Sequence, residues 1–124
     1  MVMLAAHHAA GLCQNDLHPG NFLIADERIY SIDGDAVEAR RGPLGHRRSL
    51  RNLALFCAQF LPDIDALSLE ASADYAIARG WSVTQLRDRL PGLIAAARLR
   101  RLAQEGLAWR YPGGAPEKVR KMLE

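Results

Sequence analysis

The stretch CQNDLHPGNFLIADERIYSIDGD, residues 13–35, decides the fold class because it joins a polar loop to a β-hairpin. Proline and glycine interrupt the loop at 12–21, where they disfavour helix and strand alike. The following residues predict two short strands, 22–25 and 28–32, joined by a tight polar turn at Asp26 and Glu27. A hairpin set among helices is therefore expected.

Helical patterns flank this stretch on its N-terminal side, and a loop follows it. Residues 1–10 are rich in Ala, Leu and Met, which favour helix, and Gly11 is a natural stop signal. Residues 34–46 lose all periodicity and contain two glycines and a proline near their end, so we expect a loop there.

Three longer helices are expected beyond this loop. Segment 47–61 has apolar residues at helical spacing, and segment 68–79 ends just before Gly80. The sequence SVTQ at 82–85 resembles a capping box and should start a long helix that Pro91 kinks or divides. The apolar stripe of the first of these helices should belong to the core: Leu50, Leu53, Phe56 or Cys57, and Phe60 or Leu61. The expected fold class is α+β and mostly helical.

Composition limits the class of protein further. The 124 residues suffice for a single domain, 1–124, and 49% apolar with 24% charged residues argues against disorder. The net charge of +2 is too small to imply a polyanion partner. Cys13 and Cys57 lack paired spacing, so we expect no disulfide and a reducing, cytoplasmic location.

The polar residues of the opening stretch suit metal-assisted phosphoryl transfer. Asp16 and Asn21 lie in one loop, and Asp33 follows a hairpin that folds the chain back, so the three side chains can converge. Mg²⁺ prefers hard oxygen ligands such as Asn and Asp side chains. Asn21 and Asp33 could supply these ligands, and Asp16 would accept the proton of an attacking hydroxyl. Each residue taken singly would also suit an ordinary turn.

The motifs NDLHPGN (15–21) and IDGD (32–35) resemble the catalytic loop and metal-binding Asp of the protein-kinase-like superfamily. The sequences NFL and YSIDGD are most similar to the lipopolysaccharide kinases, which phosphorylate inner-core heptose or Kdo sugars. This resemblance implies ATP as co-substrate, Mg²⁺ as cofactor, and the C-terminal lobe of the kinase-like fold, with catalytic loop and hairpin at 12–35 and a helical remainder at 47–124.

The same resemblance implies roles for individual residues. Asp16 would be the catalytic base, and Asn21 and Asp33 would bind the metal and the nucleotide phosphates. Asp35 is a further candidate metal ligand. His18 takes the place of a lysine near the transferred phosphate, where it would steady charge or shape the loop.

Several departures from the family pattern change what is expected. Gln14 and Asn15 replace the His and Arg that open the protein-kinase loop, so control by loop phosphorylation is not expected. Asn52 stands where many relatives have an Asp in the helix below the loop. No lysine or Gly-rich strand precedes residue 13. We therefore expect a lobe that binds ATP weakly or not at all unless upstream sequence or another chain supplies the N-terminal lobe.

Two other functions stay open, namely a non-catalytic interaction module and a fragment of a small-molecule kinase of the aminoglycoside or choline type. Arginines form two clusters that suit phosphates of a lipopolysaccharide acceptor or the anionic cytoplasmic face of the inner membrane: Arg40, Arg41, Arg47, Arg48 and Arg51, and then Arg98, Arg100 and Arg101. Without interleaved aromatic residues they predict no nucleic-acid partner. The histidines at 7 and 8 lack the spacing of a zinc site.

Overall fold

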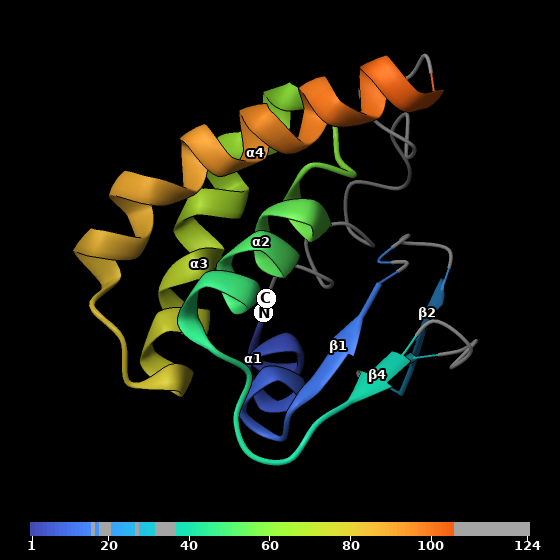
Figure 1. The fold of residues 1–124 in the computed structure, drawn as a ribbon, viewed down its shortest axis with the longest axis vertical. Helices are drawn as coiled ribbons and strands as arrows, with labels where there is room; N and C mark the ends of the chain where they lie inside the picture. Colours follow the sequence, from blue (N-terminus) through green and yellow to red (C-terminus); the bar gives the residue numbers. More distant parts are fainter. Residues whose placement is uncertain (16, 18–20, 27, 32–36, 106–124) are drawn as a thin grey trace.

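The computed structural model describes residues 1–15, 17, 21–26, 28–31 and 37–105. Most of them form helices, and two small antiparallel sheets lie beside these (Figure 1). In chain order the elements are α1 (Val2–Ala9), β1 (Leu12–Gln14), β2 (Phe22–Ala25), β3 (Arg28–Ser31), β4 (Val37–Ala39), α2 (His46–Cys57), the 3₁₀ helix η2 (Pro62–Ile64), α3 (Asp65–Arg79) and α4 (Val83–Glu105). The predicted α+β, mostly helical class is confirmed, whereas the kinase-like lobe stays a prediction.

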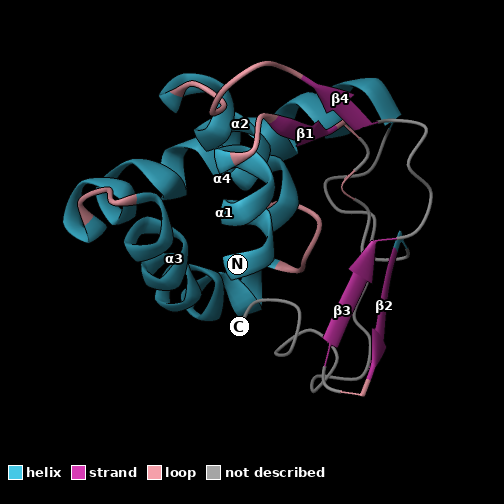
Figure 2. Ribbon diagram, turned by 90° about the horizontal axis from the view of Figure 1, so that it is seen from below, coloured by secondary structure: helices cyan, strands magenta, loops and turns pink. Residues whose placement is uncertain are grey.

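The core lies among the four α-helices. Helix α3 packs against α1 and α4, and α2 packs against α4. The apolar stripe predicted for the segment 47–61 is confirmed, because these side chains are buried: Leu50, Leu53, Phe56, Cys57 and Phe60. Full burial of one large apolar side chain stabilises a fold by about 1.5–3 kcal/mol. The β2–β3 hairpin stands to one side of the helices (Figure 2), and Ile24 and Ile29 pack it against the helical core.

Gly11 ends α1 and holds the chain close to a later segment. Its φ is +82°, a conformation that favours glycine, and a Cβ here would lie 2.4 Å from the carbonyl oxygens of both Arg40 and Gly42. The Arg40 N–H donates to the Gly11 carbonyl at 2.9 Å. The predicted stop is therefore confirmed, and glycine is also needed because two backbone segments meet there.

Two loop predictions were partly wrong, since residues 12–14 and 37–39 pair as an antiparallel ladder. Leu12 faces Ala39, Cys13 faces Glu38 and Gln14 faces Val37. Strands of three residues are too short to show a period of two, and β4 is exposed along its whole length, so no apolar alternation marks it. The predicted hairpin is confirmed, with Ala25 paired to Arg28 across a two-residue turn.

The C-terminal helices largely follow their predicted signals. Helix α3 begins at Asp65, three residues before the predicted start, because η2 leads directly into it, and Gly80 ends it with φ +68°. The N–H of Gln85 donates to the Ser82 hydroxyl at 3.3 Å, which is half of a capping box. Of the two effects predicted for Pro91, a kink or a division of the last helix, division is wrong, since α4 continues through it. Proline removes the helical partner of the carbonyl four residues earlier, which belongs to Arg87, and Arg87 and Pro91 are both exposed residues.

Of the helices that the structure describes, none combines the length and the apolarity that crossing a lipid bilayer requires. Cys13 and Cys57 are both buried free thiols. Burial raises the pKa of the Cys57 thiol to about 12, which leaves it almost entirely protonated at neutral pH.

Candidate functional site

Most of the predicted catalytic residues lie outside the described part of the chain. This holds for Asp16, His18, Asp33 and Asp35, whereas Asn21 is described and is half-buried immediately before β2. Whether Asp16, Asn21 and Asp33 converge therefore stays a prediction.

The structure does show how the two ends of the segment that carries these residues are held. Gln14 ends β1 and is paired with Val37, the first residue of β4. Asp16 follows Gln14 by two positions, and Asp35 precedes Val37 by two positions. The pairing of Gln14 with Val37 thus places the two ends of this segment side by side.

Asn52 of α2 connects the end of β1 to α1. Its amide Nδ2 donates to the Gln14 carbonyl at 2.8 Å, and its Oδ1 lies 2.8 Å from Nε2 of His8. Because the Gln14 carbonyl can only accept, the amide orientation is fixed, and Nε2 of His8 must carry the proton that Oδ1 accepts. Asn52 and His8 are both buried. The Asn52 side chain therefore holds Gln14, two residues from Asp16, against the helices.

The same network continues into α3 through Tyr75 and Arg79. With Nε2 of His8 protonated, Nδ1 accepts from the Tyr75 hydroxyl at 2.5 Å. Arg79 donates to that hydroxyl at 3.1 Å and to the Leu44 carbonyl at 3.0 Å. Burial first of all, and then the nearby Arg79, lower the pKa of His8 to about 4, although its bond to Asn52 opposes this shift. His8 is a neutral, hydrogen-bonded core residue at neutral pH.

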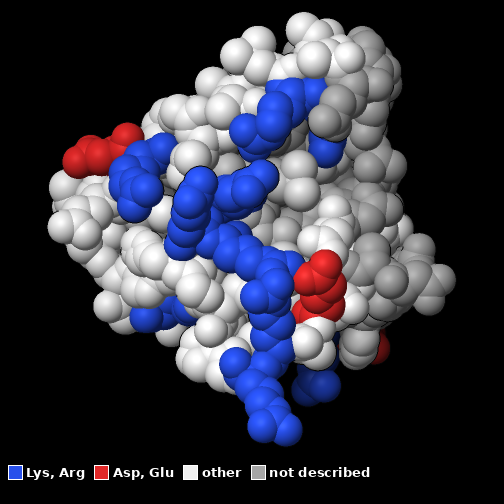
Figure 3. All heavy atoms as spheres, in the orientation of Figure 1, with Lys and Arg blue, Asp and Glu red and all other residues white. Residues whose placement is uncertain are grey.

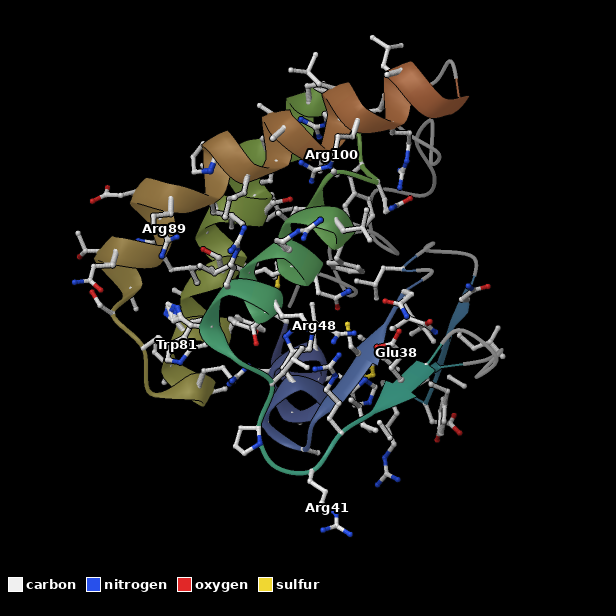
Figure 4. The ribbon with its side chains drawn as sticks, viewed as in Figure 1. Glu38, Arg41, Arg48, Trp81, Arg89 and Arg100 are labelled. Carbon is white, nitrogen blue, oxygen red and sulfur yellow. The ribbon has the colours of Figure 1, made fainter. Side chains whose placement is uncertain are left out.

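Arginines surround a cavity of about 560 Å³ beside the end of β1. We call it the arginine cavity, and its lining includes Cys13 and Asn15 at the end of β1, Arg47, Arg48 and Arg51 of α2, and Arg100 of α4. Figure 3 shows a band of basic side chains across this face of the molecule, and Figure 4 shows Arg48 and Arg100 within it. The two arginine clusters of the sequence, far apart along the chain, thus contribute to one concave surface.

Among the described residues, Glu38 is an acidic neighbour of this cavity, and the sequence did not point to it. Arg48 forms a salt bridge with Glu38, and Asn15 Nδ2 donates to the other carboxylate oxygen at 3.1 Å (Figure 4). The hydrogen bond from Arg48, followed by that from Asn15, lowers the pKa of the Glu38 carboxyl. Glu38 became visible as a site residue only through the β1–β4 pairing, which places it opposite Cys13.

The first turns of α2 carry positive charge in places that weaken a helix. Arg47 and Arg51 are four residues apart and so share one face, where like charges destabilise by about 0.2–0.5 kcal/mol. The first turn contains no acidic residue, although the positive end of the helix dipole lies there. Helix stability therefore does not explain why arginines occupy these positions. Residues that weaken local structure are typical of binding sites.

A second, smaller cavity of about 360 Å³ lies at the N-terminal end of α4. His46 and Trp81 stack there with ring centroids 3.9 Å apart, and Asp88 and Arg89 give its lining both signs of charge. Trp81 also packs against the core. This cavity carries no excess of positive charge.

No group of three or more His, Cys, Asp or Glu side chains that could hold a metal occurs among the described residues. The predicted Mg²⁺ ligands Asp33 and Asp35 are not among them, so the magnesium site stays a prediction. No family model, curated protein or solved structure matched the chain. The kinase-like assignment therefore depends on the sequence motifs and on the geometry around them.

Proposed function

We propose that this chain is the C-terminal lobe of a kinase-like sugar kinase that transfers the γ-phosphoryl group of ATP to a hydroxyl of a lipopolysaccharide inner-core sugar. The order and spacing of Asp16, Asn21 and Asp33 carry the proposal. The β1–β4 ladder supports it, because the segment that bears all three begins and ends at neighbouring residues, Gln14 and Val37.

The proposed reaction is a single displacement at phosphorus. The sugar hydroxyl oxygen attacks the γ-phosphorus, the bond to the bridging oxygen breaks, and ADP leaves. Asp16 accepts the proton of the hydroxyl, a role worth about 10²–10⁴-fold in rate. Asn21 and Asp33, with Asp35 as a further ligand, would hold Mg²⁺, which supplies neutralisation of the charge that builds on the phosphates. An N-terminal lobe on another segment or chain would hold most of the nucleotide.

The buried network gives the proposed catalytic loop a rigid foundation. Asn52 binds the Gln14 carbonyl and is itself held by His8 and, through it, by Tyr75. Asn15, the residue before Asp16, is further tied to Glu38 of β4. Precise placement of a general base needs such support from neighbouring hydrogen bonds. These contacts suit a positioned catalytic loop better than a free surface turn.

The test is metal binding by the chain itself, because it needs neither the second lobe nor the acceptor. With Mn²⁺ as a paramagnetic substitute for Mg²⁺, we expect selective broadening of the NMR amide signals of Leu17, Asn21 and Phe22. Asp33→Asn should abolish this broadening. Asp26→Asn is the matched control, because it removes the same charge from the hairpin turn, and Asn tolerates the left-handed φ of +48° found there.

The outcomes separate the proposal from its alternative. Broadening that Asp33→Asn removes and Asp26→Asn leaves in place supports the phosphotransferase. Absence of broadening, or equal broadening in both variants, contradicts it and favours a non-catalytic interaction module.

A further inference from the structure

We propose that the arginine cavity binds the phosphate group of a phosphorylated sugar and so holds an acceptor that is already anionic. Identification of this sugar as the acceptor rests on the proposed function, whereas binding to the cavity does not. The described residues that line the cavity come from β1, from Asn15 directly after it, and from α2 and α4.

Positive side chains outnumber negative ones in the described lining of the arginine cavity. Arg48 is paired with Glu38, but Arg47, Arg51 and Arg100 have no carboxylate partner among the described residues. All three are exposed, and the described residues of the lining include no acidic side chain. Positive charges gathered around one hollow attract an anion, and an anion placed among them relieves their mutual repulsion.

The chemistry of the lining fits phosphate better than a single carboxylate. A guanidinium presents paired N–H donors that match two phosphate oxygens, and several such groups can surround one phosphate dianion. A volume of about 560 Å³ lies within the usual range for small-molecule sites and far exceeds one phosphate ion. Leu55 adds a half-buried apolar wall that the C–H face of a sugar ring can contact.

The position of the cavity links it to the proposed chemistry. Asn15 lines it, and Asp16 is the next residue in the sequence. A sugar phosphate anchored by the arginines would have its ring beside the end of β1. The anchor would thereby bring a hydroxyl toward the residue that the sequence assigns as the base.

A flat anionic membrane is the competing partner for the basic band. Arg41 is not among the lining residues, and it lies at the bottom of the view in Figure 4, apart from Arg48 and Arg100. A bilayer surface would engage outlying arginines as well as lining ones. Arg47 and Arg51, whose like charges weaken α2, both line the arginine cavity. Their position favours a small ligand over a membrane.

The test compares two double variants of equal charge change in the full chain, without nucleotide or metal. Arg47→Gln with Arg51→Gln removes two lining charges, and Arg41→Gln with Arg89→Gln removes two exposed charges outside the lining. Binding of glucose 6-phosphate, with glucose as the uncharged probe, is followed by NMR titration of the Asn15, Arg48 and Leu55 amides. We expect the lining variant to bind about tenfold or more weakly and the control to bind as the parent does.

Other outcomes overturn the proposal. They are equal binding of glucose and its phosphate, equal weakening in both double variants, absence of binding, and binding to phosphatidylglycerol vesicles alone, which would assign the band to a membrane surface. An unchanged thermal melting curve shows that each variant is folded. Asp33→Asn separates the two proposals, because it removes the predicted metal site and leaves sugar-phosphate binding intact. If Mn²⁺ does not bind but sugar phosphate does, the kinase proposal fails and the cavity remains a binding site.

Discussion

At the scale of single residues, Asn52 shows why an amide and a carboxylate are not interchangeable in a buried network. One end of its side chain donates to a carbonyl and the other end accepts from an imidazole. A carboxylate has only acceptors when ionised. The sequence indicated that the support of the loop differs here from the family pattern, and the structure gives the reason: the backbone group that needs support, the Gln14 carbonyl, is an acceptor.

We therefore expect Asn52→Asp to destabilise the protein by about 1–3 kcal/mol at neutral pH, because the Gln14 carbonyl loses its donor and faces a negative oxygen instead. Urea unfolding measures this change. Gln59→Glu is the comparison, because Gln59 is also buried and its Nε2 also donates to a carbonyl, that of Leu55 at 3.1 Å. Its Oε1 accepts from Arg101 at 2.9 Å, so a carboxylate there would gain an ion pair, and we expect a smaller loss. If Asn52→Asp loses no more unfolding free energy than Gln59→Glu, the hydrogen bonds described for Asn52 are contradicted.

The sequence pointed to some site residues and missed others for identifiable reasons. Asp16, Asn21 and Asp33 were predicted as site residues because their spacing is local and matches a motif, and they stay predictions. Glu38 became a candidate only when distant segments met, and the sequence had no signal that Arg100 would join Arg47, Arg48 and Arg51 around one cavity. Motif spacing thus indicates chemistry, whereas the lining of a cavity depends on tertiary packing.

At the scale of elements, the junction between α1 and the β1–β4 ladder is the most constrained backbone described. Gly11 combines a left-handed conformation with contact to two carbonyl oxygens, and Leu44 N–H donates to the His8 carbonyl nearby at 2.7 Å. A side chain at this position would push the start of β1 away from the end of β4.

Gly11→Ala should consequently destabilise the fold by about 3 kcal/mol or more, because left-handed strain and steric overlap add. Gly42→Ala is the control: its φ of +75° is similar, but a Cβ there meets nothing within 4 Å. We expect only the conformational cost of about 1 kcal/mol from that variant. Urea unfolding gives both values, and hydrogen exchange of the Arg40 amide should accelerate in Gly11→Ala alone. If both variants lose the same amount of unfolding free energy, steric overlap at Gly11 does not contribute.

Elements with strong local signals were predicted well, and those defined by long-range pairing were not. The four α-helices and the hairpin have periodic apolar residues, glycine stops or a two-residue turn. The strands β1 and β4 are too short and β4 is too exposed to show such a pattern, so pairing between Gln14 and Val37 decides their structure. Pro91 was overestimated as a breaker because an exposed carbonyl can turn to water.

At the scale of the whole molecule, burial of an uncharged histidine makes stability depend on pH. The ordinary pKa of His8 is 6.5 and the folded value is about 4, so the unfolded chain binds more protons between these values. The contribution of His8 is complete above pH 6.5 and is lost as the pH falls toward 4. The full contribution of His8 to the free energy of unfolding is roughly 3 kcal/mol, because each unit of difference in pKa corresponds to about 1.36 kcal/mol.

The free energy of unfolding, measured by urea at a series of pH values, should therefore decrease from pH 6.5 to pH 4. In His8→Gln, which cannot titrate, this slope should flatten. Burial also lowers the pKa of His7, which is only half-buried, so His7→Gln should retain most of the slope. If both variants keep the slope of the parent, His8 is not the group responsible.

The β1–β4 ladder has a consequence for how this architecture can be altered. The stretch between Gln14 and Val37 starts and ends at one paired position of the ladder, so its two ends are held side by side. It is also anchored along its length, because Leu17 lies in the helical core and Ile24 and Ile29 pack against that core. A grafted replacement must therefore close across the same pair and supply apolar side chains at these three places, and the remaining positions are those free to acquire new chemistry.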